Sequence, residues 1–171
     1  MTPNPTTRPP LAEQRLVYAL DHIALSDAIQ AVRALAGVVK IYKIGPSLIY
    51  QGGLDAACQI VNAGRETGQG VKVFLDMKTN DIPETVLNAI DAIEKYGKDS
   101  VVFATIHTAH VDLRSLASAR GSRQFKIIAV THLTSLDESD LRQMGVQLSL
   151  TEYVRLMAQR AYDFGWDGVV C

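Results

Sequence analysis

Six short apolar runs, separated by helical patterns, most constrain what this 171-residue chain can fold into. They are rich in Val and Ile, and most are continuous rather than alternating. They span residues 16–20, 38–44, 71–75, 100–106, 126–130 and 168–171. Continuous apolar runs of this length are typical of parallel strands that are covered on both faces. We therefore predict repeated βα units that build a parallel sheet.

Helical patterns fill the gaps between the runs, with apolar residues recurring at helical spacing. Ser26, Asp137 and Ser149 precede three of these patterns as N-cap residues, and Pro83 suits the first turn of another. The predicted helices span residues 26–36, 54–67, 83–97, 112–119, 137–144 and 149–164.

The end of the first run bears on the choice between an open doubly wound sheet and a barrel. Ala19-Leu20-Asp21-His22 stands there, where a dinucleotide-binding fold would carry a glycine fingerprint. This favours an α/β fold of the (β/α)8 TIM-barrel type, although the pattern alone leaves the open sheet as an alternative. A complete barrel has eight strands and about 250 residues. We therefore predict that only about six βα units are present in this chain.

Bulk composition narrows the setting and the class of partner. The net charge of −1 gives no reason to expect a nucleic-acid footprint or a membrane-attracting face. Cys58 and Cys171 are too few and too far apart for a disulfide framework or a zinc site, which indicates a reducing, cytoplasmic setting. We expect residues 1–13 to form a disordered tail. Residues 14–171 are then expected to form one incomplete barrel domain.

Charged residues follow the apolar residues at the C-terminal ends of three predicted strands. Because side chains alternate along a strand, Asp21, Lys43, Asp76 and Lys78 each share a face with apolar residues before them. In barrels that end forms the mouth of the active site. A structural ion-pair network is the alternative, but three strands that end alike favour a functional site. Asp81 lies one short turn beyond the third strand.

A metal site has weaker support. His107 and His110 have a spacing at which both could ligate a metal, but no third ligand can be placed. We therefore favour a loop role for both histidines and predict no metal.

The charged stretch resembles the signature of the orotidine 5′-phosphate decarboxylase family. It reads Asp76-x-Lys78-x-x-Asp81-Ile82-Pro83-x-Thr85. Further segments in the same order are similar to that family: Ala19-Leu20-Asp21, Lys43-Ile44-Gly45, and residues 130–135, 145–149 and 167–171.

The resemblance implies decarboxylation of orotidine 5′-monophosphate to UMP, without a metal or organic cofactor. Lys78 would be the general acid that protonates C6 of the pyrimidine as CO2 leaves. Asp76 would sit beside the substrate carboxylate, and Lys43 and Asp81 would complete an alternating charge array.

The resemblance also implies binding roles and a homodimer. Asp21 and Lys43 would hold ribose hydroxyls, and Thr134 would contact the pyrimidine. Asp81 would reach into the partner subunit's site. The implied substrate-binding residues are Asp21, Lys43, Asp76, Ile82, Thr85 and Thr134.

Two departures from the family limit these expectations. The chain ends at Cys171, before the segments with which the family grips the phosphate, so we expect either a fragment or a short form. The loop after the fourth strand has His107 in place but lacks the family's glycines. A sugar-phosphate decarboxylase of the same superfamily, or a non-catalytic dimerising remnant, are the alternative functions.

Overall fold

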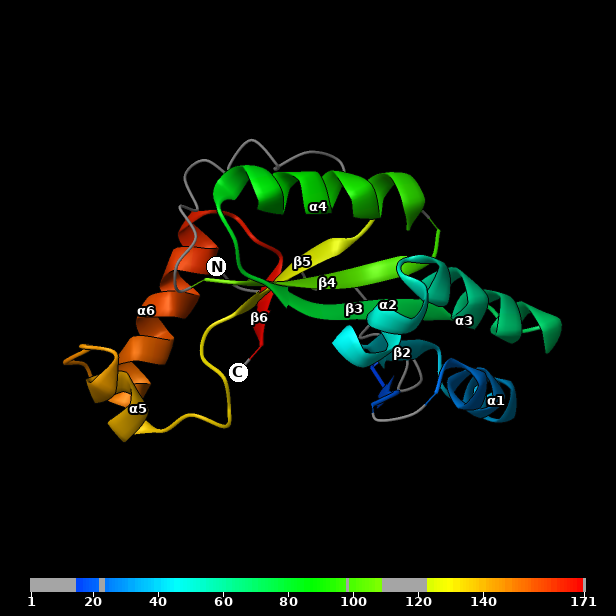
Figure 1. The fold of residues 1–171 in the computed structure, drawn as a ribbon, viewed down its shortest axis with the longest axis horizontal. Helices are drawn as coiled ribbons and strands as arrows, with labels where there is room; N and C mark the ends of the chain where they lie inside the picture. Colours follow the sequence, from blue (N-terminus) through cyan, green and yellow to red (C-terminus); the bar gives the residue numbers. More distant parts are fainter. Residues whose placement is uncertain (1–14, 22–23, 98, 109–122, 171) are drawn as a thin grey trace, which may run out of the picture. The chain divides into compact units, whose positions relative to one another are not determined.

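The structure is a computed structural model that describes residues 15–21, 24–97, 99–108 and 123–170. The predicted tail at 1–13, the predicted helix at 112–119, His110 and Cys171 lie outside the described residues. The elements, labelled in Figure 1, are β1 (Val17–Ala19), α1 (Leu25–Leu35), β2 (Ile41–Ile44), α2 (Pro46–Gly52), α3 (Asp55–Glu66), β3 (Lys72–Thr79), α4 (Pro83–Tyr96), β4 (Val101–His107), β5 (Lys126–Val130), α5 (Glu138–Gln143), α6 (Leu150–Asp163) and β6 (Gly168–Val170).

The strands form a sheet in the order β1-β2-β3-β4-β5-β6. The pairs β1–β2, β4–β5 and β5–β6 are parallel. Each strand thus follows its predecessor in the chain, whereas the strand order of a doubly wound sheet reverses at a switch point. The structure therefore confirms the α/β fold of the barrel type, with six strands among the described residues.

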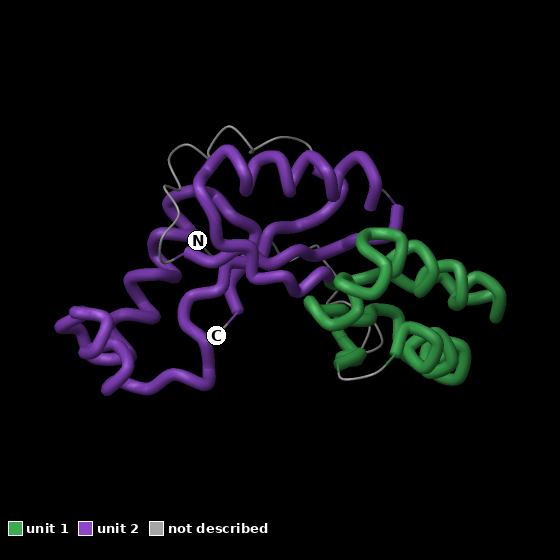
Figure 2. The backbone as a smooth tube through the Cα atoms, viewed as in Figure 1, with its two compact units in different colours: residues 1–74 green, residues 75–171 purple. Residues whose placement is uncertain are grey.

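Figure 2 shows that the chain divides into two compact units, residues 1–74 and 75–171, with the boundary inside β3. In the first unit, α1 and α2 pack on α3, and α2 also contacts β2. Val32, Tyr42, Ile44, Leu48 and Ile60 are fully buried there. These side chains come from all three helices and from one face of β2.

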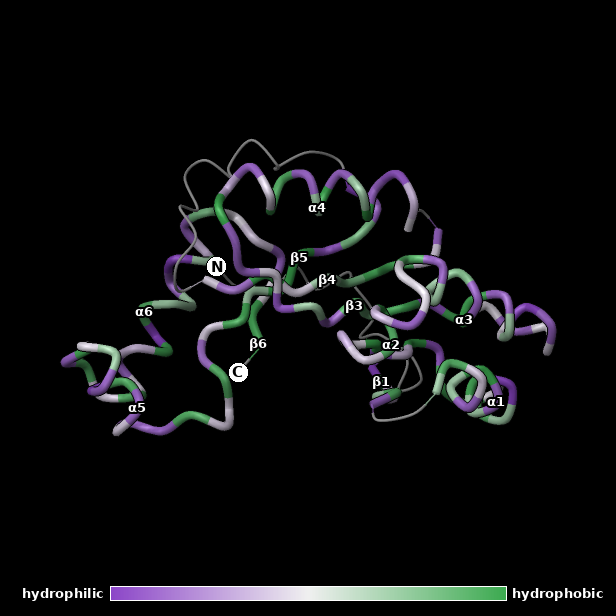
Figure 3. Tube along the Cα trace, in the orientation of Figure 1, coloured by the Kyte–Doolittle hydropathy of each residue, from purple (hydrophilic) through white to green (hydrophobic). Residues whose placement is uncertain are grey.

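The second unit has its core between the strands and α4. Figure 3 shows hydrophobic and hydrophilic residues alternating along α4. Its buried residues, Val86, Ile90 and Ile93, recur at helical spacing and face Leu75 and Ala104 across a small cavity. α6 packs against β6. The amphipathic pattern of α4 thus fixes which face of the neighbouring strands is covered.

The N-cap residues predicted from the sequence match the observed helix starts in two of three cases. Asp137 and Ser149 are the N-caps of α5 and α6, and both form capping boxes as their spacing predicts. The prediction of Ser26 as an N-cap was wrong, because α1 begins at Leu25 with Ala24 at its N-cap. Helix α2 was missed, although Pro46 gives the usual signal of a first helical turn.

The strands differ from the predicted apolar runs in two respects. The apolar run that predicted β3 ends at Leu75, whereas the strand continues to Thr79 and so includes Asp76 and Lys78, as their placement by alternation requires. The predicted burial of the strands on both faces is wrong for β1, whose residues are all exposed, and for most of β6. These two strands lie at the ends of the strand order, so each has only one neighbouring strand among those described.

Candidate active site

Asp76 and Lys78 form an ion pair at the C-terminal end of β3. The distance from Lys78 Nζ to Asp76 Oδ2 is 2.9 Å. Asp76 is only 8% exposed, whereas the Lys78 side chain is 42% exposed. Charge-assisted hydrogen bonds of this length are stronger than neutral ones. The pair therefore combines a buried carboxylate with an ammonium group that other molecules can reach.

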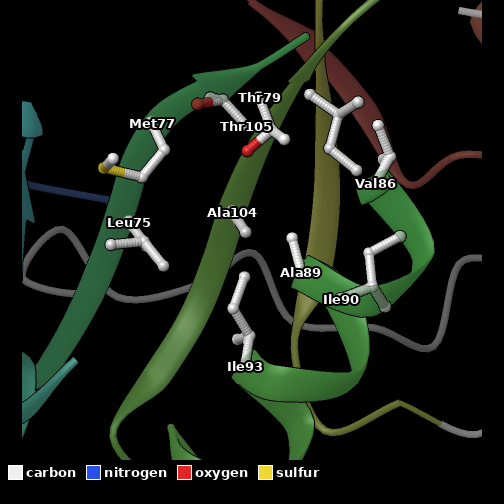
Figure 4. Close-up of a pocket in the computed structure, with 10 residues that line it drawn as sticks. Leu75, Met77, Thr79, Val86, Ala89, Ile90, Ile93, Ala104 and Thr105 are labelled. Atoms are coloured by element: carbon white, nitrogen blue, oxygen red, sulfur yellow. The ribbon is translucent and has the colours of Figure 1, made fainter. Parts of the chain in front are cut away.

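The apolar side of β3 anchors this pair. Leu75, Met77 and Thr79 line a small cavity beside α4, together with Ile90 of that helix (Figure 4). Because side chains alternate along a strand, Asp76 between them points to the opposite face of the sheet. The packing of α4 thus determines the face on which Asp76 stands.

Thr105, on β4, binds both partners of the ion pair. Its Oγ1 donates to Asp76 Oδ1 at 2.9 Å and accepts from the Lys78 backbone N–H at 2.8 Å. Lys78 has a φ of 48°, in the left-handed region that costs a non-glycine residue about 1–2 kcal/mol. Sequence reasoning missed Thr105, although a hydroxyl inside the apolar run 100–106 was an available signal.

Asp21 and Lys43 form a second ion pair, within the first compact unit. Lys43 Nζ lies 3.2 Å from Asp21 Oδ2, and both side chains are partly exposed. The parallel register of β1 and β2 places Ala19 opposite Lys43, and Leu20 N–H donates to the Lys43 carbonyl at 2.9 Å. This register brings Asp21, two positions after Ala19, close to Lys43.

The other predicted site residues lie on exposed segments of the second unit. Asp81 Oδ1 accepts from the Ile82 backbone N–H at 2.7 Å, just before α4 begins. Ile82 is 65% exposed, and Thr85 is exposed in the first turn of α4. Thr134 is exposed in the loop between β5 and α5. Asp81, the ionisable residue among these four, joins no ion pair with another described residue.

A cavity of about 370 Å³ adjoins Lys78 in the second unit. This volume lies within the range of small-molecule pockets. The rings of His132 and Tyr153 meet edge to face, with their centroids 5.4 Å apart. Burial raises the pKa of the Tyr153 phenol. The cavity is lined by Lys78, Asn80, His107, His132, Leu133, Leu136, Met144, Val146 and Tyr153.

Two kinds of feature are absent from the described part of the chain. Within it, no three His, Cys, Asp or Glu side chains gather closely enough to hold a metal ion. Nor does that part contain a helix long and apolar enough to cross a membrane.

Comparison with known proteins identifies relatives along the whole chain. It is 37% identical over 171 residues to the orotidine 5′-phosphate decarboxylase of Afipia carboxidovorans, covering 100% of this chain and 67% of the relative. It is 38% identical over 160 residues to that of Rhodopseudomonas palustris strain BisA53, covering 94% of this chain and 64% of the relative. The chain thus spans about two thirds of the length of these curated relatives.

Solved structures also match this chain. The orotidine 5′-phosphate decarboxylase of Lactobacillus acidophilus matches with a TM-score of 0.75 and 30% identity, over 91% of this chain and 70% of that one. An uncharacterized conserved protein from Geobacillus kaustophilus matches with a TM-score of 0.76 and 31% identity, over 91% and 72%. The family profile described as "Orotidine 5'-phosphate decarboxylase / HUMPS family" matches residues 14–171. The resemblance predicted from the sequence is confirmed, and the chain belongs to the orotidine 5′-phosphate decarboxylase / HUMPS family.

Proposed function

We propose that this protein decarboxylates orotidine 5′-monophosphate to UMP. The observation that carries the proposal is the ion pair between Asp76 and Lys78, 2.9 Å long, in a chain of this family. In the proposed step the bond from C6 to the carboxylate breaks, and its electron pair stays on C6 as CO2 leaves. The Lys78 ammonium then gives a proton to C6 and is reprotonated from water.

The residue types suit this chemistry. Negative charge develops at C6 in the transition state, and an ammonium group held nearby stabilises it before protonating it. Asp76 keeps that ammonium in place. Its carboxylate also lies beside the substrate carboxylate and repels that group until CO2 departs. We attribute most of the effect to charges that are fixed in advance, because such charges need no reorganisation as the reaction proceeds.

Substrate binding is proposed for the second ion pair and for Thr134. Asp21 can accept hydrogen bonds from ribose hydroxyls and Lys43 can donate to them, and both side chains are partly exposed. We also propose, as the family resemblance implies, that Lys43 and Asp81 add to the alternating charges of Asp76 and Lys78. Thr134, exposed after β5, contacts the pyrimidine. These assignments follow the matching positions of the family's motif.

We further propose that the protein acts as a homodimer in the cytoplasm. Asp81, Ile82 and Thr85 reach into the partner subunit's site. Ile82 is compatible with this arrangement, because its side chain is 65% exposed and would bury apolar surface against a second subunit. Asp81 lies directly beside it in the chain.

The test compares two substrates, because a sugar-phosphate decarboxylase of the same superfamily is the alternative function. Purified protein is incubated separately with orotidine 5′-monophosphate and with 3-keto-gulonate phosphate, and CO2 release and UMP formation are measured. We expect CO2 and UMP in equal amounts from the first substrate alone. CO2 from the sugar phosphate alone would replace the proposal with the sister activity. A protein that releases CO2 from neither would be the non-catalytic remnant.

A further inference from the structure

Thr105 occupies an unusual position, since one hydroxyl contacts both members of the ion pair in the second unit. It donates to Asp76 Oδ1 at 2.9 Å and accepts from the Lys78 N–H at 2.8 Å. Thr105 is 1% exposed, so water does not compete for either bond. A hydroxyl has a single proton to donate. Because the Lys78 N–H must occupy a lone pair, the hydroxyl proton points to Asp76.

The two oxygens of the Asp76 carboxylate therefore have different partners. Oδ1 accepts from Thr105, and Oδ2 accepts from Lys78 Nζ at 2.9 Å. Two bonds from different directions constrain the rotation of the carboxylate about its χ2 angle. The position of the ammonium group then follows from the carboxylate that holds it.

The backbone of Lys78 is the second element that Thr105 holds. A φ of 48° is unfavourable for lysine, and such conformations persist only where the surroundings determine them. The bond from the Lys78 N–H to Thr105 is one such determinant, and it crosses from β3 to β4. Thr105 thus acts on Lys78 in two ways: it binds the Lys78 backbone N–H, and it holds the Asp76 carboxylate that pairs with the Lys78 ammonium.

We propose that Thr105 is a positioning residue for proton delivery, setting the place of the Lys78 ammonium through the Asp76 carboxylate and the Lys78 backbone. This inference rests on the proposed function. Thr105 need not touch the substrate. Displacing a reacting group by about 1 Å can slow a reaction on the order of 10²-fold. Loss of the hydroxyl should therefore lower kcat more than it changes KM.

The chain offers a matched set of variants. Thr105→Val removes the hydroxyl and keeps the branched shape, whereas Thr105→Ser keeps the hydroxyl and removes the methyl group. Thr108→Val is the control, because Thr108 is fully buried and its hydroxyl donates to the Val130 carbonyl at 2.8 Å, away from Asp76. It also loses a buried hydrogen bond of a threonine hydroxyl, but one donated to a backbone carbonyl rather than to the Asp76 carboxylate.

The first measurement is kcat and KM for orotidine 5′-monophosphate. We expect Thr105→Val to lower kcat about 10- to 100-fold with little change in KM, as for a misplaced reacting group. We expect Thr105→Ser and Thr108→Val to keep kcat close to that of the unsubstituted protein. A normal kcat in Thr105→Val would overturn the proposal, as would an equal loss in Thr105→Ser. If the valine variant does not fold, Thr105→Ala takes its place.

The second measurement needs no substrate and separates this inference from the proposed function. Amide hydrogen exchange at Lys78 is followed by NMR in the same variants. We expect Thr105→Val to speed exchange at Lys78 at least tenfold relative to the unsubstituted protein, and Thr108→Val to leave it unchanged. Unchanged protection in Thr105→Val would overturn the inference. If the unsubstituted protein does not convert orotidine 5′-monophosphate, the proposed function fails, and exchange at Lys78 alone decides whether Thr105 holds the pair.

Discussion

Two replacements of Asp76 should separate what its carboxylate does for the fold from what it does for catalysis. Asp76→Ala leaves the Thr105 hydroxyl, buried in the protein, without the acceptor it has at 2.9 Å. An unsatisfied buried hydroxyl costs about 1–3 kcal/mol of unfolding free energy. The lost ion pair adds only about 0–1 kcal/mol, because the Lys78 side chain is 42% exposed and solvent screens it.

Asp76→Asn should behave differently. Its amide oxygen can still accept from Thr105, so we expect it to lose about 1 kcal/mol or less of unfolding free energy. Both variants remove the negative charge that holds Lys78, and we expect both to lower kcat by about 10²–10³-fold, the effect of losing one fixed electrostatic group. Asparagine should therefore preserve the fold without preserving catalysis.

The assay is urea denaturation of each variant together with kcat for orotidine 5′-monophosphate. Asp91→Asn, at an exposed position on α4, is the matched control and should change neither quantity. The reasoning would be refuted if asparagine destabilised the protein as much as alanine, or if Asp76→Asn kept kcat within threefold of the unsubstituted protein.

Two further predictions concern stability. A Cβ at Gly64 would lie 2.9 Å from a buried methyl carbon of Val71, so the overpacking penalty of about 1–3 kcal/mol should outweigh the gain of about 1 kcal/mol in helix propensity in Gly64→Ala. Gly70→Ala, with open space around its Cβ, should be neutral in the same urea titration. Hydrogen bonds from the side chain and backbone of Ser149 lower the pKa of Glu152 from 4.5, so the carboxylate stabilises the fold above that pH and this contribution is lost as pH falls through the lower folded-state value. Ser149→Ala should therefore lose more unfolding free energy, relative to the unsubstituted protein, at pH 7 than at about pH 3. An equal loss at both pH values would refute this role of the Glu152 carboxylate.

The sequence predicted best what depends on residues close together in the chain. Asp137 and Ser149 cap their helices through partners three residues on, so their spacing alone was sufficient. The pairing of Asp76 with Lys78 likewise follows from alternation within one strand.

Contacts between strands could not be predicted in the same way. Thr105 meets Asp76 because β3 and β4 bring together residues 29 positions apart, and no periodicity within either strand contains that register. The left-handed backbone of Lys78 also gave no signal, because glycine or asparagine usually marks such a conformation. The apolar run in β3 ends at Leu75, so hydropathy alone did not mark the end of the strand at Thr79.

The most direct test of the proposed function is single-turnover conversion of orotidine 5′-monophosphate by the unsubstituted protein and by Lys78→Ala, with UMP binding measured in parallel. We predict UMP formation by the unsubstituted protein. We predict a rate at least about 10³-fold lower in Lys78→Ala, because both the general acid and the charge that stabilises C6 are lost. UMP binding should remain measurable in the variant, and the exposed Lys126→Ala should retain full activity. Equal single-turnover rates with and without the Lys78 ammonium would contradict the account, as would an unsubstituted protein that binds UMP but forms none.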